Sequence, residues 1–190
     1  LSPRFSASYA FTDKWFLNFN IGRYYQLPPY TSLGFRGNNG ALVNDSLGIR
    51  YISSDQVALG VEFLPRKSSR ISVEWFYKGY NHYPFSLADS ISMASKGGDY
   101  GAVGAEPVTP TSKGRAYGFE VLYRDVDLFK FNIILSYTFV RSEFTNISGE
   151  YIPSAWDNRN LFNITVGRKF KHHWEIGAKW RFAGGSPYTP

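Results

Sequence analysis

The sequence predicts an all-β protein, specifically an antiparallel, up-and-down segment of a transmembrane β-barrel with about eight strands. Three observations support this class. Apolar and polar residues alternate through nearly every ordered stretch, and no stretch keeps the three-and-four spacing of an amphipathic helix. Aromatic residues make up 18% of the 190 residues and carry much of the hydrophobicity. The connections alternate between tight turns and long segments rich in Gly, Pro, Ser and Asn.

The first two strands are expected on either side of a tight turn at Asp13-Lys14. Their apolar side chains are Phe5, Ala7, Tyr9 and Phe11, then Trp15, Leu17, Phe19 and Ile21. After a long segment, the alternation resumes at 57–63 and at 71–77, on either side of a turn within 66–69. The positions in between are mostly polar or small, so each strand has one apolar face and one polar face.

The second half of the chain repeats this arrangement. Strands are predicted at 117–123 and 131–139 around a turn in the 125–128 region, and at 162–166 and 174–182 around a turn at 171–173. The positions opposite the apolar ones include Arg, Lys, Glu, Asn and Gly, which suit a water-filled interior better than a packed core. One face of the sheet is therefore expected to contact lipid and the other water.

Strand length favours a membrane barrel over a soluble β-sandwich. Ten residues that rise about 3.3 Å each and tilt by about 40° span roughly 25 Å, the height of the apolar band of an outer-membrane barrel. Sandwich strands are usually about five or six residues long. Aromatic residues near both strand ends predict two girdles. Those near the tight turns are Trp15, Phe63, Phe129, Phe170 and Trp174, and those toward the long loops are Tyr24, Tyr77, Tyr80, Tyr117, Phe139 and Phe182.

Composition excludes several other classes of function. The absence of Cys excludes disulfide scaffolds, zinc ribbons and thiol nucleophiles. The net charge of +6 comes from scattered basic residues without a basic helix or a stacking platform, so we expect no nucleic-acid partner. No Gly-x-Ser-x-Gly elbow is present, and the three His are poorly placed for one metal ion. We therefore expect no enzyme activity, no catalytic residue, no cofactor and no bound metal.

One candidate ligand-binding group lies near a junction between a loop and a strand. Trp156, Asp157 and Arg159 combine a ring, a carboxylate and a guanidinium, which could stack on and hydrogen-bond a polar ligand. The alternative interpretation is that Asp157 and Arg159 hold the base of the loop to the sheet.

A second candidate group lies at the end of the fourth strand. Tyr80, His82 and Tyr83 either contact a ligand or serve as girdle and loop anchor. The glycine-rich segment 96–104 matches neither a Walker loop nor a dinucleotide fingerprint, so we interpret it as an outer loop.

Six short clusters follow one another along the chain. They are 22–30 (GRYYQLPPY), 76–78 with 83–84 (FYK, YP), 114–120 (GRAYGFE), 136–138 with 141–142 (SYT, RS), 156–159 (WDNR) and 184–190 (GGSPYTP). In this order they resemble the later half of the barrel of TonB-dependent outer-membrane receptors. Together the clusters extend over almost the whole chain.

The resemblance implies a 22-stranded barrel in the Gram-negative outer membrane that encloses an N-terminal plug and is energised by TonB. Such a receptor imports a scarce nutrient: an iron chelate, cobalamin, a glycan or a peptide. The chain lacks the plug, the TonB-contacting segment and the closing C-terminal strands of the full pattern. Residues 1–190 are therefore expected to form a partial barrel domain. Its implied partners are outer-membrane lipid, the remaining strands and plug, the nutrient, and TonB through an absent segment.

The order of the connections also favours a partial barrel. Because the first connection is a tight turn, the first strand runs toward the periplasm and the last strand runs back out. Both ends of the chain would then lie outside the cell, whereas a complete barrel normally begins and ends in the periplasm. The alternative is a complete small eight-stranded outer-membrane barrel with a structural or adhesion role.

Overall fold

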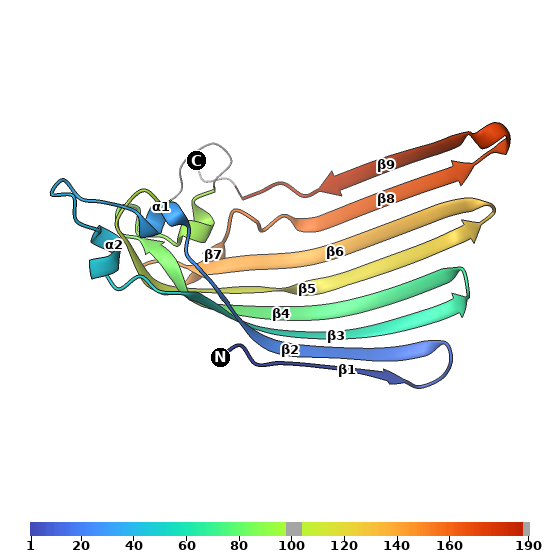
Figure 1. Ribbon diagram of the computed structural model, residues 1–190, viewed down its shortest axis with the longest axis horizontal. Helices are drawn as coiled ribbons and strands as arrows, with labels where there is room; N and C mark the ends of the chain where they lie inside the picture. Colours follow the sequence, from blue (N-terminus) through green and yellow to red (C-terminus); the bar gives the residue numbers. More distant parts are fainter. Residues whose placement is uncertain (98–103, 188–190) are drawn as a thin grey trace.

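A computed structural model describes residues 1–97 and 104–187 and confirms the all-β class. Nine strands form one antiparallel sheet in the order β1-β2-β3-β4-β5-β6-β8-β9, and β7 pairs with β6 outside this path (Figure 1). The strands are β1 (Arg4–Ala10), β2 (Trp15–Gln26), β3 (Ile52–Arg66), β4 (Ser69–Ser86), β5 (Val108–Leu128), β6 (Phe131–Thr145), β7 (Tyr151–Pro153), β8 (Arg159–Lys169) and β9 (Glu175–Ala183).

The eight predicted strands are all present, and the short strand β7 is an addition that the alternation does not predict. It lies in the long connection after β6, where it pairs with residues Glu143 to Thr145. The centre of the glycine-rich segment 96–104 and the end of the 184–190 cluster lie outside the described residues.

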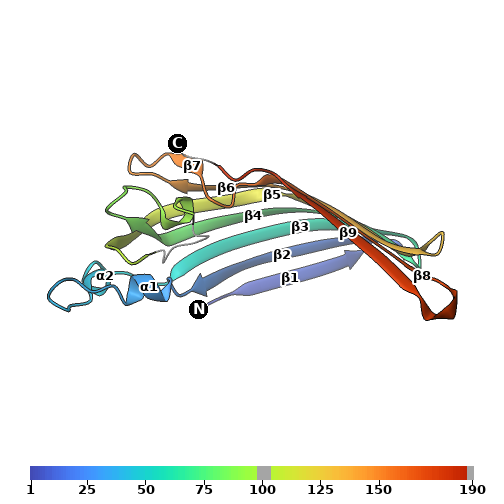
Figure 2. The ribbon, with the colours of Figure 1, turned by 90° about the horizontal axis from the view of Figure 1, so that it is seen from above.

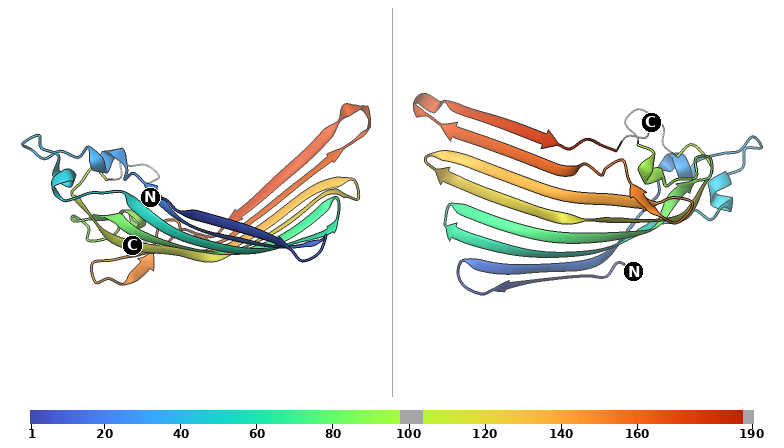
Figure 3. Two further views of the ribbon diagram at one scale, coloured as in Figure 1. Left: turned by 60° about the horizontal axis from the view of Figure 1, so that its bottom comes forward. Right: turned by 180° about the vertical axis from the view of Figure 1, so that it is seen from behind.

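The sheet is curved like a trough and is open along two edges (Figures 2 and 3). The tight turns lie at one end of the strands, and the long connections lie at the other, where β1 begins and β9 ends (Figure 1). Within the described residues, β1 pairs only with β2 and β9 only with β8. These strands therefore do not close on one another into a small barrel.

The register separates the sheet into an apolar and a polar face, as predicted. One continuous row of cross-strand neighbours consists of Tyr9, Leu17, Val61, Val73, Val121, Tyr137, Phe162 and Phe182. Several of these side chains are exposed to an extent unusual for apolar residues, for example Val73 at 45%. The adjacent row on the other face includes Ser8, Asn18, Glu74, Glu120 and Thr138. The apolar face therefore requires an apolar environment outside the chain.

Charged residues bound the apolar face at both ends. Toward the loops, Arg115 pairs across the strands with Glu143, and toward the turns Arg66 forms an ion pair with Asp125. Arg115 and Asp125 lie on the same strand, ten residues apart. At about 3.3 Å per residue and a tilt of about 40°, that separation gives an apolar band roughly 25 Å high. This is the thickness expected of a membrane-spanning barrel wall.

The turn between β5 and β6 lies later than predicted. The sequence places it in the 125–128 region, but β5 continues to Leu128 and the turn is Phe129-Lys130, with φ of 52° and 66°. Asp125 is instead buried in the sheet, where its carboxylate accepts hydrogen bonds from the Asp127 N–H at 3.0 Å and from Arg66 at 2.5 Å. Asp125 therefore joins two neighbouring hairpins rather than forming a turn.

The long connections at the other end are joined to one another by hydrogen bonds. Asn44 is fully buried: its amide N–H groups donate to the carbonyls of Ser32 and Glu106, and its side-chain oxygen accepts from the Val108 N–H. The helical turns α1 (Tyr30–Leu33) and α2 (Val43–Ser46) lie in the first of these connections, and η1 (Met93–Ser95) lies in the second. The third connection is joined to the second by the Ala155 N–H, which donates to the carbonyl of Ala94 at 3.0 Å.

An ion-pair network completes this assembly. Lys96 pairs with both Asp89 and Glu106, and Glu106 also accepts a hydrogen bond from the Ser86 hydroxyl. Partial burial lowers the pKa of Lys96, but the hydrogen bonds to the two carboxylates outweigh it and hold that pKa above its usual value. The described residues contain no helix long and apolar enough to cross a membrane.

The two faces should respond differently to a charge. We expect Val73→Arg, in the middle of the apolar band, to destabilise the protein by about 2 to 4 kcal/mol, because a guanidinium there would enter hydrocarbon. The neighbouring Ser72→Arg places the same charge on the polar face and should change stability by less than about 0.5 kcal/mol. Urea unfolding from phospholipid vesicles measures both. Equal losses would show that the faces are wrongly assigned.

Candidate functional site

The polar face lines the inside of the trough. A hollow of about 490 Å³ is bordered by side chains from six strands, which is possible only on the concave side of a curved sheet. Its polar members are Asn20, Gln56, Glu74, Lys78, Tyr80, Glu120 and Thr138. The concave wall is therefore the polar face of the sheet.

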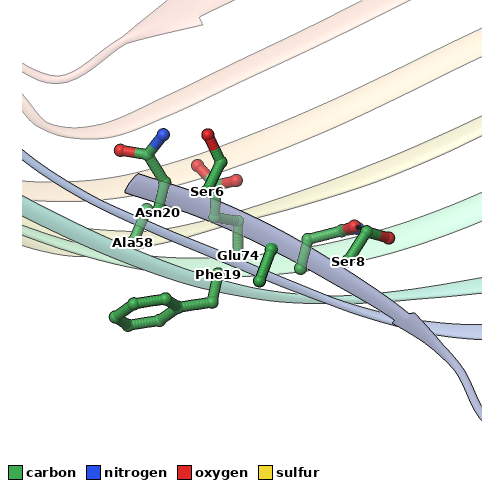
Figure 4. Close-up of a pocket in the computed structure, with 8 residues that line it drawn as sticks. Ser6, Ser8, Phe19, Asn20, Ala58 and Glu74 are labelled. Carbon is green, nitrogen blue, oxygen red and sulfur yellow. Dashed lines mark hydrogen bonds between the residues drawn. The ribbon is translucent and has the colours of Figure 1, made fainter. Parts of the chain in front are cut away.

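A second hollow of about 390 Å³ lies on the same wall, over β1, β2, β3 and β4 (Figure 4). Ser6, Asn20 and Glu74 point to one side of the sheet, whereas Phe19 points to the other. The hollow forms because side chains here are small, including Ala58 and the hydroxyl residues of β1. Its lining offers hydroxyl, amide and carboxylate groups for hydrogen bonding.

Two carboxylates lie directly opposite each other on this wall. Glu74 of β4 is the cross-strand partner of Glu120 of β5, and like charges in that position are mutually destabilising. The Thr138 hydroxyl donates to Glu120 at 3.3 Å, but neither carboxylate forms an ion pair within residues 1–97 and 104–187. Glu62, by contrast, pairs with Arg70 at 2.7 Å. The opposed pair therefore lacks a neutralising cation in the described part of the chain.

The structure brings the predicted residues Tyr80 and Tyr83 together around Phe144. The Tyr80 ring stacks on Phe144 with centroids 5.6 Å apart, and Tyr83 meets the same ring edge-on at 4.7 Å. Phe144 is buried against Gly114, where a Cβ atom would lie 2.2 Å from the ring. Tyr80 also borders the larger hollow. This aromatic cluster anchors the loop end of β4 and presents Tyr80 to the interior.

The structure also brings Asp157 and Arg159 together. Asp157 is 1% exposed, accepts a hydrogen bond from the Ser142 N–H at 2.8 Å, and forms ion pairs with Arg141 at 3.3 Å and Arg159 at 3.5 Å. These contacts attach the segment before β8 to strand β6. The geometry therefore favours the interpretation in which Asp157 and Arg159 hold the loop base.

The remaining predicted residues lie apart from these groups. Trp156 is 58% exposed, and its ring makes no aromatic or cation contact with the described residues. His82 occupies the irregular stretch of β4 between Tyr80 and Tyr83, with φ of 58°. No group of three or more His, Asp or Glu within the described residues could hold a metal ion.

Four residues of these groups are not predicted as site residues from the sequence: Phe144, Gly114 and the opposed carboxylates Glu74 and Glu120. Alternation places both carboxylates on the polar faces of their strands, but only the register between β4 and β5 makes them neighbours. The sequence signal for this pair is that each of two consecutive strands carries a carboxylate on its polar face.

The sheet is curved, its convex face is apolar over the height of a membrane, and its concave wall is polar. These three features define a segment of a transmembrane barrel wall. A sequence model described as "TonB dependent receptor-like, beta-barrel" matches residues 1–190. The chain belongs to this family of outer-membrane receptors.

Solved structures share the same fold. The chain superposes on the pyoverdine outer membrane receptor FpvA from Pseudomonas aeruginosa with a TM-score of 0.66 and 14% identity over 97% of this chain and 25% of that one. For the ferric-catecholate import receptor Fiu from E. coli K12 the TM-score is 0.66, with 16% identity over 95% and 24%. For the alcaligin outer membrane receptor FauA from Bordetella pertussis it is 0.61, with 17% identity over 96% and 29%.

The chain thus spans about a quarter of the length of the receptors it resembles. No curated protein sequence gives a significant match.

The aromatic cluster gives a direct test of packing. We expect Gly114→Ala to destabilise the loop end of β4 and β5 by about 1 to 3 kcal/mol, because the new methyl group would overlap the Phe144 ring. Gly79→Ala is the matched control, since its Cβ would have ordinary contacts at 3.6 Å or more. Thermal unfolding and Tyr fluorescence of the two variants measure the difference. Equal stability would mean that Phe144 moves aside without cost.

Proposed function

We propose that this chain is part of the barrel of a TonB-dependent receptor that binds a scarce nutrient and imports it across the Gram-negative outer membrane. The observation that carries the proposal is the family match over the whole chain, on strands whose apolar face has the height of a membrane. Members of the family and the similar structures are receptors and transporters rather than enzymes.

The free edges support a larger barrel. In hydrocarbon each unpaired backbone N–H or C=O costs several kcal/mol, so an open sheet is unstable there. Strands β1 and β9 therefore pair with further strands of the same barrel, as the coverage of about a quarter of each similar receptor suggests. We propose that residues 1–190 form a partial domain of a 22-stranded barrel, with the plug, the closing strands and the TonB-contacting segment lying outside it.

The opposed carboxylates support a partner inside the barrel. Glu74 and Glu120 face the interior without a cation of their own, so a basic side chain of the plug is a suitable partner for them. Glu62 needs no such partner because Arg70 already neutralises it. We therefore assign this part of the concave wall to plug contact rather than to nutrient binding.

Among nutrients, we propose an iron chelate. The similar receptors are described with pyoverdine, a ferric catecholate and alcaligin as their ligands or cargo, whereas cobalamin, glycans and peptides have no such support here. Tyr80 on the interior wall and the exposed Trp156 remain the best candidates for nutrient contact. His82 and Tyr83 act through the anchoring of β4, and Asp157 and Arg159 through the loop base.

Import can be tested in cells. A strain whose receptor carries this chain should grow with ferric pyoverdine or a ferric catecholate as the sole iron source, and growth should stop when either the receptor or TonB is deleted. Cyanocobalamin uptake in the same strains is the control for a different cargo. Growth on every iron source without the receptor, or without TonB, would contradict the proposal.

If Glu74 and Glu120 contact the plug, removing their charges should make the receptor leak. Glu74→Gln combined with Glu120→Gln should leave the stability of the barrel wall unchanged or higher, because it removes a repulsive pair, but should loosen the plug. Cells carrying the double variant should become more sensitive to large antibiotics that the closed receptor excludes, such as vancomycin. Glu62→Gln is the matched control, since its carboxylate pairs within the wall. If the double variant were no more sensitive to vancomycin, the assignment of this part of the wall to plug contact would be wrong.

A further inference from the structure

Three basic side chains face the interior at the turn end of the concave wall. They are Arg124 of β5 and Lys179 and Arg181 of β9, named here the turn-end cations. Arg124 lies four residues along β5 from Glu120, and residues at even spacing in a strand share one face. Arg124 is therefore on the same wall as the opposed carboxylates and nearer to the tight turns.

The register extends this face from β5 to β9. One row of cross-strand partners consists of Arg124, Ile134, Thr165 and Lys179. Arg181 lies two residues beyond Lys179 on β9 and therefore faces the same way. Neighbouring strands are about 4.8 Å apart, so the backbones at Arg124 and Lys179 are roughly 14 Å apart across the wall. The turn-end cations are thus spread over a wide area with uncharged residues between them.

The turn-end cations are not neutralised by the wall itself. Within residues 1–97 and 104–187 none of them forms an ion pair, and all three are exposed. Arg70, directly opposite Arg124, differs because Glu62 pairs with it at 2.7 Å. Their surplus positive charge is therefore presented to the interior.

A hollow of about 360 Å³ lies beside Lys179. Gly167 and Gly177 are cross-strand partners in its lining, so no side chain fills the space above the backbone there. A Cβ atom on either glycine would make only ordinary contacts, at 3.9 Å and 3.6 Å, so close backbone packing does not require glycine at these positions. Asn132 and Thr165 add an amide and a hydroxyl to the lining. The hollow therefore has room and hydrogen-bonding groups for part of a polar ligand.

The position of the turn-end cations relates them to the path of the nutrient. Arg70, opposite Arg124, lies ten residues along β4 from Tyr80, the proposed nutrient contact. At about 3.3 Å per residue and a tilt of about 40°, this separates the two levels by roughly 25 Å. A nutrient that moves from Tyr80 toward the periplasmic turns therefore reaches the turn-end cations last.

The spacing of these cations favours a moving anion over a fixed partner. Glu74 and Glu120 repel each other at adjacent positions, so a single basic side chain can relieve both. Cations roughly 14 Å apart need no such relief. A cleft lined with one sign of charge raises the local concentration of ions of the other sign, and several weak contacts allow an ion both to enter and to leave.

We propose that the turn-end cations and the hollow beside them draw an anionic ferric chelate toward the periplasmic mouth of the barrel. This inference rests on the proposed function and narrows its cargo. Three catecholates leave a ferric complex with a net negative charge, because each contributes two phenolate oxygens, whereas three hydroxamates leave it neutral. The cargo is therefore a chelate of the catecholate kind, with negative charge in excess of the iron.

The test uses cells that express the complete receptor containing this chain and receive radioactive iron as a ferric tris-catecholate. Arg124→Gln combined with Lys179→Gln should lower the import rate about 10-fold, the lower end of the effect of a charged cleft on local concentration. Binding of the chelate to cells treated with an uncoupler should not change, because the turn-end cations lie far from the outer contact. This binding also shows that the variant is folded.

Two further variants separate charge from shape. Arg124→Lys combined with Lys179→Arg keeps both charges and should import iron at nearly the unmodified rate. Lys67→Gln combined with Lys171→Gln removes two charges at the tight turns, outside the wall, and should also import normally.

Several results would overturn the inference. One is an unchanged import rate in the double Gln variant of Arg124 and Lys179, and another is an equal loss in the charge-conserving variant. Increased vancomycin sensitivity in that double Gln variant would assign the cations to plug contact instead. Faster import of a ferric tris-hydroxamate than of the tris-catecholate would show that the cargo is not anionic. If the unmodified receptor imported no ferric chelate, the proposed function would fail, and this inference with it.

Discussion

Backbone hydrogen bonding in a medium without water is the constraint on which this structure depends. Long antiparallel strands satisfy the N–H and C=O groups of their neighbours, and the register is regular through the apolar band from β2 to β8. The irregular positions lie at the ends, near Phe63, Asp125 and Tyr80, where water can replace a missing partner. Within the described residues β1 and β9 are each paired on one side only, so the same constraint leaves their outer backbone groups without a partner strand.

Because the backbone pairing is regular, the two sides of the wall differ in their side chains alone. Because the pleat has a period of two, a single register assigns every residue to lipid or to the interior, and a slip by one position would exchange them all. This division appears twice in the chain. Glu74 and Glu120, which form no ion pair with the described residues, face the interior, and Arg115 and Arg141, which pair with the buried Glu143, face outward. One sheet thereby offers surfaces of opposite chemistry a few ångströms apart.

The strands could be predicted from the sequence because alternation is a local signal. The same alternation also showed which side of each strand is polar and which is apolar. Contacts between strands could not, since Glu74 and Glu120 or Gly114 and Phe144 become neighbours only through the register. The turn after β5 was misplaced because Asp125 is a common turn residue, whereas Phe129 and Lys130 rarely adopt positive φ. Asp157 could be placed at a loop base from its position, but its burial depends on contacts with Ser142 and Arg141 of β6, which lie far from it in the sequence.

The hydrogen bonds of Asn44 affect how the sequence of the long connections can vary. It joins the first two long connections through the peptide groups of Ser32, Glu106 and Val108 and not through their side chains. The bridge therefore fixes the backbone at 32, 106 and 108 without requiring a particular side chain there, except that Pro at 108 would remove the N–H that donates to Asn44. The exposed parts of these connections can therefore vary in sequence while one buried amide preserves the path of the backbone.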